Sequence, residues 1–215
     1  MSRSRTSLAE PVGSGETVRP PAGLAPQPTT RERIIRTAAE LFAANGYHAT
    51  GITEILDAVG LSRGTFYYHV TSKDALLYEI SNNQVRRMNE VADDVTRLKI
   101  TPTEKMRMLA QSLVRNISDH DAEWTVFFRE FEALQGEQRA EILDARERYE
   151  ATWRKVLQAG VRSGEFGKVS PLHVKGILGM LNYSYLWINP RGTLNAEQIA
   201  DCFVDLLLDG LRPRP

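Results

Sequence analysis

The chain has 215 residues, of which 42% are hydrophobic and 25% are charged, with 27 basic and 27 acidic side chains. This composition is ordinary for a globular protein and excludes a fibrous or wholly disordered chain. Because the formal net charge is zero, a nucleic-acid partner has to be recognised from a local motif. The single cysteine, Cys202, cannot form an internal disulfide, so we expect a reducing cytoplasm and a small core residue at this position.

The first 28 residues contain five of the ten prolines and no apolar run like that of a secretory signal. We expect a disordered tail over residues 1–28. The longest nearly apolar stretch, residues 176–188, is too short to span a bilayer and is interrupted by Asn182 and Ser184. No membrane segment is predicted.

Residues 29–78 show apolar side chains at helical spacing, in short runs separated by helix caps. Asn45-Gly46 and Gly60 are typical of helix ends, whereas Ser62 and Ser72 are typical of helix starts. The pattern predicts four helices, over about 29–45, 52–59, 62–70 and from 72 onward.

Beyond residue 80 the helical runs lengthen, and no segment keeps the alternation of a strand. The fold class is therefore predicted to be all-α, with a three-helix helix-turn-helix unit over 29–78 and a larger helical bundle over 79–215. Breaks are expected at 101–102, 118–119, 136, 163–164, 170–171 and 189–192.

Helices 52–59 and 62–70 are joined by the tight turn Gly60-Leu61, which is the arrangement of a helix-turn-helix. The second helix of such a motif enters the major groove with its N-terminal residues leading. Phe66 faces the small core at helical spacing. The residues expected to face DNA are Arg63, Gly64, Thr65, Tyr67, Tyr68 and His69.

The stretch LFAANGYHATGITEILDAVGLSRGTFYYHVTSKDALL resembles the N-terminal domain of the TetR family of transcriptional regulators. The resemblance covers about residues 30–78, with Gly51 and Val70 departing from the family pattern. It implies DNA binding, with Thr53 reaching a base and Lys73 and Tyr68 contacting phosphate. The matching positions are Phe42, Gly46, Thr50, Ile55, Gly60, Tyr67, His69, Lys73 and Leu76.

Arg63 is expected to read sequence, because its guanidinium can bind O6 and N7 of guanine together. The segment is electrically neutral, since five basic residues oppose five acidic ones between 30 and 78. Affinity is therefore expected to depend on a few placed hydrogen-bond donors.

In the larger domain, the resemblance implies ligand binding and dimerisation. The segment EWTVFFREFEALQ places Trp124, Phe127, Phe128 and Phe131 on overlapping helix faces, and Tyr183 is expected to join them around an apolar effector. Plain core packing is the alternative for each of these residues. The segment Trp187–Leu194 is similar to a subgroup of the family that responds to acyl-coenzyme A thioesters.

A homodimer interface is expected on residues 151–161 and 174–187, where Gly176 and Gly179 permit close helix approach next to Met180 and Trp187. An enzyme is not favoured: the segment VGSGET lacks the lysine of a phosphate loop, and no histidine lies in a catalytic or metal-binding pattern. No cofactor and no metal are expected. The prediction is a ligand-responsive repressor, with an activator or a helix-turn-helix that binds protein as alternatives.

Overall fold

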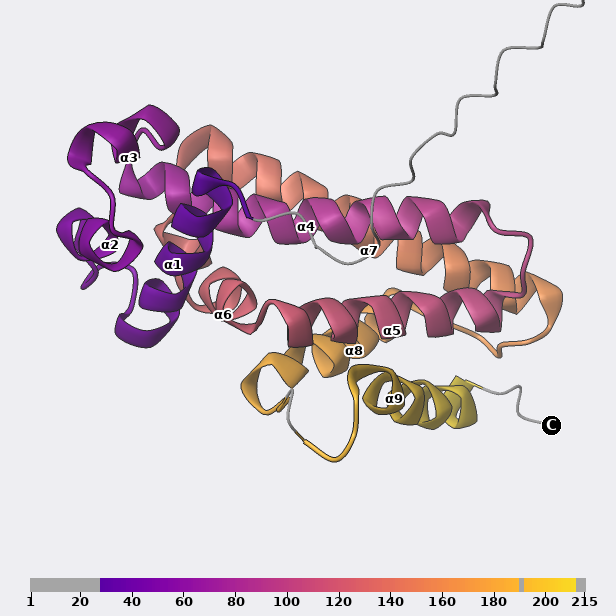
Figure 1. Cartoon of the computed structure of the whole chain (residues 1–215). Coiled ribbons are helices and arrows are strands. Elements are labelled where there is room, and N and C mark those ends of the chain that lie inside the picture. Colours follow the sequence, from indigo (N-terminus) through magenta and orange to yellow (C-terminus); the bar gives the residue numbers. More distant parts are fainter. Residues whose placement is uncertain (1–27, 190–191, 212–215) are drawn as a thin grey trace, which may run out of the picture.

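The structure is a computed structural model that describes residues 28–189 and 192–211. Within these ranges every element is a helix, which confirms the all-α class (Figure 1). The tail expected over residues 1–28 lies, apart from Pro28, outside the described residues. The helices are α1 Thr30–Asn45, α2 Ile52–Val59, α3 Arg63–His69, α4 Lys73–Arg97, α5 Pro102–Asp119, α6 Asp121–Glu130, α7 Gly136–Ser163, α8 Pro171–Asn182 and α9 Ala196–Leu211, with short 3₁₀ helices η1 Phe131–Ala133 and η2 Tyr183–Leu186.

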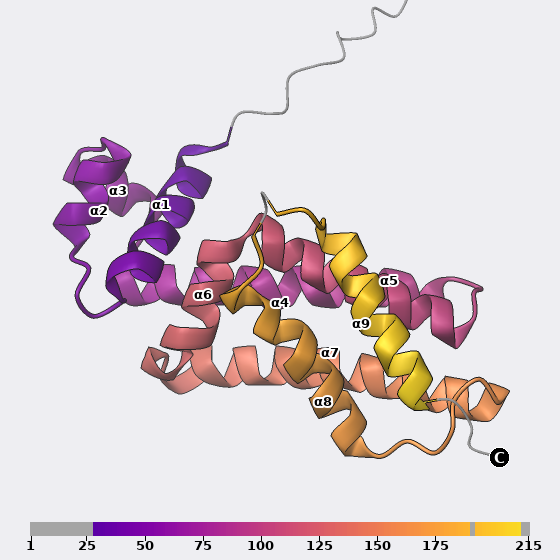
Figure 2. The ribbon, with the colours of Figure 1, turned by 90° about the horizontal axis from the view of Figure 1, so that it is seen from below.

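Figure 1 shows α1, α2 and α3 gathered at one end of the molecule, while α4, α5 and α7 run along its length. Helices α8 and α9 lie along the lower side in that view, and Figure 2 shows them next to each other from below. The breaks expected at 101–102, 118–119, 136, 163–164 and 170–171 coincide with helix ends to within a residue or two, and the one expected at 189–192 falls in the connection between η2 and α9.

Side-chain caps set the starts of the N-terminal helices. The Thr29 amide donates to Glu32 Oε2 at 2.8 Å and the Glu32 amide donates to Thr29 Oγ1 at 3.2 Å, forming a capping box at α1. Ser62 and Ser72 accept hydrogen bonds from backbone amides at the starts of α3 and α4. Gly60 ends α2 with a φ of 72°, a left-handed conformation that favours glycine.

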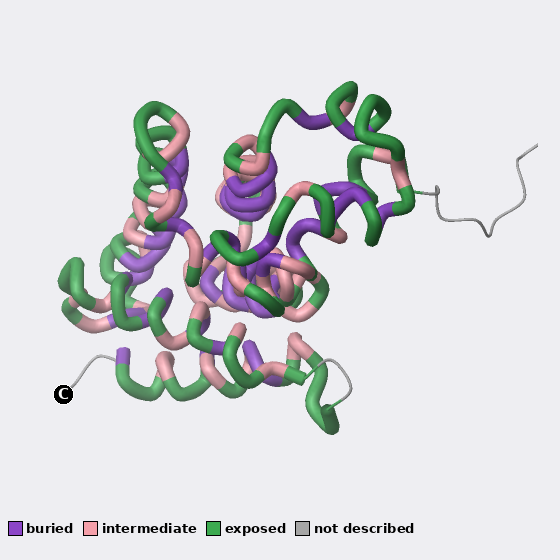
Figure 3. The backbone as a smooth tube through the Cα atoms, turned by 90° about the vertical axis from the view of Figure 1, so that its left-hand side faces the viewer, coloured by how far each residue is buried: buried purple, intermediate pink, exposed green. Residues whose placement is uncertain are grey.

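The core of the N-terminal domain is small and fully apolar at its centre. Figure 3 shows buried faces of the helices turned toward one another and exposed backbone over the outer side of this end. Phe66 anchors α3 because it is completely buried among residues of the neighbouring helices. Its fully buried neighbours in this domain include Ile34, Ala38, Ile55 and Leu76.

Helix α4 runs without a break through the domain boundary expected between residues 78 and 79. It packs on α1 of the N-terminal unit and on α5, α6 and α7 of the larger bundle. Tyr78 ties it to α7, since its hydroxyl donates to Glu141 Oε2 at 2.5 Å, and burial followed by this hydrogen bond raises the pKa of Tyr78 to about 12. The two predicted domains therefore share one helix.

Helix α9 is attached to α5 by ion pairs on its inner side. Arg107 donates to Asp201 at 2.7 Å and to Asp205 at 2.6 Å, and Arg115 donates to Glu197 at 2.5 Å. The expectation of a buried Cys202 is wrong, because α9 turns this residue to its exposed side. In the described ranges, no helix combines the length and the apolar character needed to cross a bilayer.

Candidate DNA-binding surface and ligand cavity

The outer side of α3 carries a row of exposed side chains. Phe66 points inward, so its neighbours on the helix point outward, and Tyr67 and Tyr68 are 45% and 85% exposed. Arg63, Gly64 and Thr65 are exposed, whereas His69 is half-buried at the end of the helix with its ring edge-on to Tyr68. The structure therefore places the predicted α3 residues on one accessible surface.

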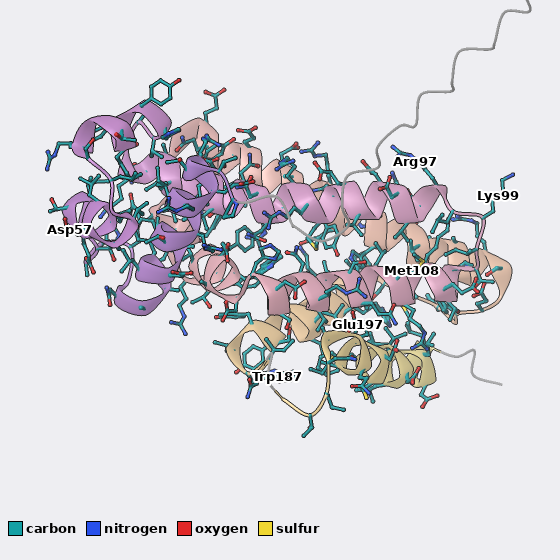
Figure 4. All side chains as sticks on the ribbon, in the orientation of Figure 1. Asp57, Arg97, Lys99, Met108, Trp187 and Glu197 are labelled. Atoms are coloured by element: carbon teal, nitrogen blue, oxygen red, sulfur yellow. The ribbon has the colours of Figure 1, made fainter. Side chains whose placement is uncertain are left out.

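Helix α2 contributes Thr53, which is exposed in its first turn. Gly51 precedes this helix and supplies no side-chain cap, so the first amides of α2 lack the partner that a serine or threonine would give. Two acidic residues, Glu54 and Asp57, are also exposed on α2, and Figure 4 shows Asp57 at the outer edge of this end. The surface has no broad excess of positive charge among its described residues.

Lys73 lies at the start of α4, where its ammonium group is already engaged. It donates to the backbone oxygens of Tyr47 and Thr50 at 2.9 and 3.0 Å and lies 4.5 Å from the centroid of the Tyr47 ring. The Tyr47 hydroxyl in turn donates to Asp74, and burial together with this hydrogen bond raises the pKa of Tyr47. In this structure Lys73 therefore fastens the turn between α1 and α2 to α4.

A cavity lies in the middle of the larger domain between α4, α5, α6, α7 and α8. It contains about 60 Å³ of free space, well below the roughly 300–1,000 Å³ of typical small-molecule pockets. Trp124 is fixed at its edge, because its indole donates to Asn116 Oδ1 at 2.8 Å. The lining residues are Val85, Met88, Leu113, Trp124, Phe127, Phe128, Arg146, Tyr149, Glu150, Leu178 and Asn182.

The structure corrects part of the predicted ligand site. Trp124, Phe127 and Phe128 line the cavity, but Phe131 lies behind Phe127 with ring centroids 6.2 Å apart. Tyr183 is outside it, because η2 turns this ring to the surface with 61% of the residue exposed. Tyr185 packs against Phe128 instead, with ring centroids 4.7 Å apart.

The residues contributed by α7 were missed from the sequence. Tyr149 and Glu150 lie one helical turn after Arg146, and all three residues face the cavity. Their only sequence signal is the spacing of Tyr149 and Trp153 within a strongly charged helix. Burial raises the pKa of the Tyr149 hydroxyl, so this group is neutral over the ordinary pH range. In the part of the chain that the structure describes, no cluster of histidine, cysteine and acidic residues is arranged to hold a metal ion.

A second exposed apolar surface lies on α8 and α9. Leu172, which is 78% exposed, stands on one face of α8 with the exposed Gly176 and Gly179. Leu206 of α9 is 64% exposed. We call the exposed side of these two helices the α8/α9 face; Trp187 lies at its edge against Phe203, and Met180 is half-buried beside it.

Residues 151–161 of α7 do not form such a surface. Trp153, Val156 and Leu157 are buried within their own chain, and Gly160 lies against the ring of Phe166. Packing inside the bundle thus covers most apolar side chains of this segment, while Val161 at its end is 38% exposed, and its part in the expected interface stays a prediction.

An exposed helix-turn-helix at one end of a helical bundle defines a DNA-binding protein of the helix-turn-helix class. Residues 34–80 match the family model for bacterial regulatory proteins of the tetR family, and residues 99–211 match the tetracyclin repressor-like C-terminal domain. The chain belongs to the TetR family of DNA-binding transcriptional regulators, which are not enzymes.

Several relatives cover most of the chain. The HTH-type transcriptional repressor KstR2 of Mycolicibacterium smegmatis is 25% identical over 193 residues, covering 86% of this chain and 92% of KstR2. The structure of PfmR from Thermus thermophilus is 31% identical with a TM-score of 0.78, covering 84% of this chain and 99% of PfmR. AibR in complex with isovaleryl coenzyme A and operator DNA is 28% identical with a TM-score of 0.73, covering 83% and 97% of the two chains.

The contacts of Lys73 predict a structural effect of its replacement. Lys73→Met removes the donor shared by the Tyr47 and Thr50 carbonyls, so we expect the free energy of unfolding to fall by about 1–3 kcal/mol. Denaturant titration of the purified protein measures this loss. Lys99→Met is the matched control, because Lys99 extends into solvent at the far end of the bundle (Figure 4). Equal stability of the two variants would show that the Lys73 contacts do not support the fold.

Proposed function

We propose that the protein is a cytoplasmic transcriptional repressor that binds its operator as a homodimer and is released by a small effector with a large apolar part. The observation that carries this proposal is the position of α6. Its aromatic residues Trp124, Phe127 and Phe128 line the cavity, and the same helix packs against α1 of the DNA-binding domain. A displacement of α6 by a ligand in the cavity would therefore act directly on α1 of the helix-turn-helix domain.

The proposed DNA contacts follow from the chemistry of the exposed side chains. Arg63 reads guanine in the major groove, while Thr65, Tyr67 and His69 donate to base edges or phosphates. Gly64 has no side chain, so DNA can approach the backbone of α3 closely at this position. Tyr68, which is 85% exposed, binds phosphate, and Thr53 reaches a base from α2. Lys73 retains one ammonium proton for a phosphate besides the two bonds it makes within the chain.

The proposed dimer forms through the α8/α9 face. Gly176 and Gly179 have open space around them within the chain, so the fold of one subunit does not require glycine there. Each glycine in a helix interior is about 1 kcal/mol less favourable than alanine. Close approach of a partner helix explains why glycines stand at these two positions. Leu172, Leu206 and Trp187 provide apolar contact around them.

The effector has to enlarge the cavity, because about 60 Å³ of free space does not hold a metabolite-sized molecule. Entry therefore displaces aromatic side chains of α6 or the helix itself. The acyl-coenzyme A class is supported by AibR, whose structure holds isovaleryl coenzyme A, and repression is supported by KstR2. An activator of the same fold is the alternative, and it differs in the position of the operator.

The DNA-binding proposal is tested by Arg63→Ala. If Arg63 reads a base, the substitution lowers affinity for the operator by about 1–3 kcal/mol and changes affinity for random DNA much less. Gel shifts with DNA from upstream of the protein's own gene, and with random DNA of equal length, measure both quantities. An equal loss on the two DNAs would leave Arg63 as a phosphate contact only.

The dimer proposal is tested by Gly176→Ala and Gly179→Ala. Each substitution improves helix propensity in the single subunit, yet its methyl group obstructs the partner helix. We expect the dimer dissociation constant to rise about tenfold or more. Sedimentation across a dilution series measures it, starting from a species of about twice 24.2 kDa. A wild-type monomer at micromolar concentration, or unchanged association in both variants, contradicts the interface.

Effector release is tested with coenzyme A thioesters of increasing acyl length. A ligand that fills the cavity raises the melting temperature as its excess grows, and it weakens operator binding. Operator DNA must weaken ligand binding by the same factor, because the coupling is reciprocal. Thermal shift and gel shift measure the two sides. Thioesters that bind without changing operator affinity would contradict the release mechanism. Phe128→Ala should lower the affinity for thioesters if this ring lines the occupied site.

A further inference from the structure

One charged group in the wall of the cavity is not explained by an apolar effector. Arg146 reaches the cavity from α7 and is half-buried. Its guanidinium lies over two aromatic rings, 5.7 Å from the centroid of Phe127 and 5.4 Å from that of Phe131. Contacts of this cation–π kind use no N–H group of the guanidinium, so its hydrogen-bond donors stay available to a ligand.

Three other arginines of α7 have carboxylate partners, and a fourth, Arg162, is exposed at the end of the helix. Arg139 is 2.7 Å from Glu132, Arg148 is 3.5 Å from Asp144, and Arg154 is 3.1 Å from Glu147. Among the residues that the structure describes, Arg146 makes no ion pair and no side-chain hydrogen bond.

The second charged residue of the cavity wall does not neutralise Arg146. Glu150 is 15% exposed in its side chain, and its Oε2 accepts a hydrogen bond from Lys175 Nζ at 2.5 Å. The negative charge of Glu150 is thus balanced by Lys175. The cavity consequently presents one uncompensated positive charge next to a largely apolar wall.

We propose that the effector is an amphipathic anion, whose acidic group binds Arg146 while its apolar part lies among Trp124, Phe127 and Phe128. This assignment rests on the proposed effector cavity and adds the chemistry of its ligand. A positive charge beside apolar side chains is unfavourable unless an anion pairs with it. A guanidinium binds either a carboxylate or a phosphate through two parallel hydrogen bonds, so a free carboxylic acid and a coenzyme A thioester share the required chemistry.

Ligands that differ only in charge test the assignment. N-Phenyl-1-naphthylamine, a neutral fluorescent probe, reports occupancy of the apolar cavity, and octanoate, 1-octanol and octanoyl-coenzyme A are titrated against it without DNA. The full-length proteins compared are wild type, Arg146→Gln and Arg148→Gln. Arg148→Gln is the matched control because it removes an equal charge from the exposed side of α7, where Arg148 is 66% exposed.

We expect Arg146→Gln to lower the affinity with which octanoate, octanoyl-coenzyme A or both displace the probe, by about tenfold or more. The affinity of 1-octanol should stay unchanged. The anion that loses affinity identifies a carboxylate or a phosphate as the group bound. The assignment is overturned if the probe does not enter the wild-type protein, if neither anion loses affinity in Arg146→Gln, or if Arg148→Gln causes the same loss. If an anion binds in an Arg146-dependent way but does not change affinity for the operator, the anion site stands and the proposed effector release is contradicted.

Discussion

The continuity of α4 is the constraint on which the rest of the structure depends. A helix of 25 residues keeps its backbone hydrogen bonds throughout, so a displacement at one end is carried to the other. Its N-terminal turns belong to the core around Phe66, and its later turns contribute Val85 and Met88 to the cavity. The DNA-binding domain therefore cannot take an orientation that is independent of the bundle.

Helix α6 adds a second connection of a different kind. It is short, it is packed on α1 rather than covalently continuous with it, and its aromatic residues contact one another at ring-centroid distances of 5.2–5.4 Å. Aromatic rings packed in this way move as a group, since a displaced ring collides with its neighbours. In the proposed mechanism, a continuous connection through α4 and a packed one through α6 would make the domain tilt rather than merely loosen.

The sequence predicted the DNA-binding domain well, because its signals are local. Ser62, Ser72 and Gly60 determine helix ends through their own side chains or backbone freedom, and each has the expected role. In contrast, Cys202 and Tyr183 were misplaced, because their exposure depends on how α9 and η2 dock on α5 and α8.

The cavity shows the same limit more clearly. The aromatic run of α6 is visible in the sequence, but the residues that face it come from α4, α5, α7 and α8. Arg146 looks like one more surface arginine of a charged helix until the fold shows which side of α7 turns inward. The carboxylates Glu132, Asp144 and Glu147 identify three paired arginines of α7, and the cavity wall distinguishes the unpaired Arg146 from the exposed Arg162.

The small size of the cavity bears directly on regulation. A ligand changes a conformational equilibrium only to the extent that it binds one conformation more tightly than the other. A ligand that bound both conformations equally well would change nothing. Here the free space is about 60 Å³, so the occupied cavity must belong to a conformation with α6 or its aromatic side chains displaced. In the mechanism proposed above, tight packing around Trp124, Phe127 and Phe128 lowers the affinity for effector in the closed form, and this difference in affinity couples the cavity to the helix-turn-helix through α1.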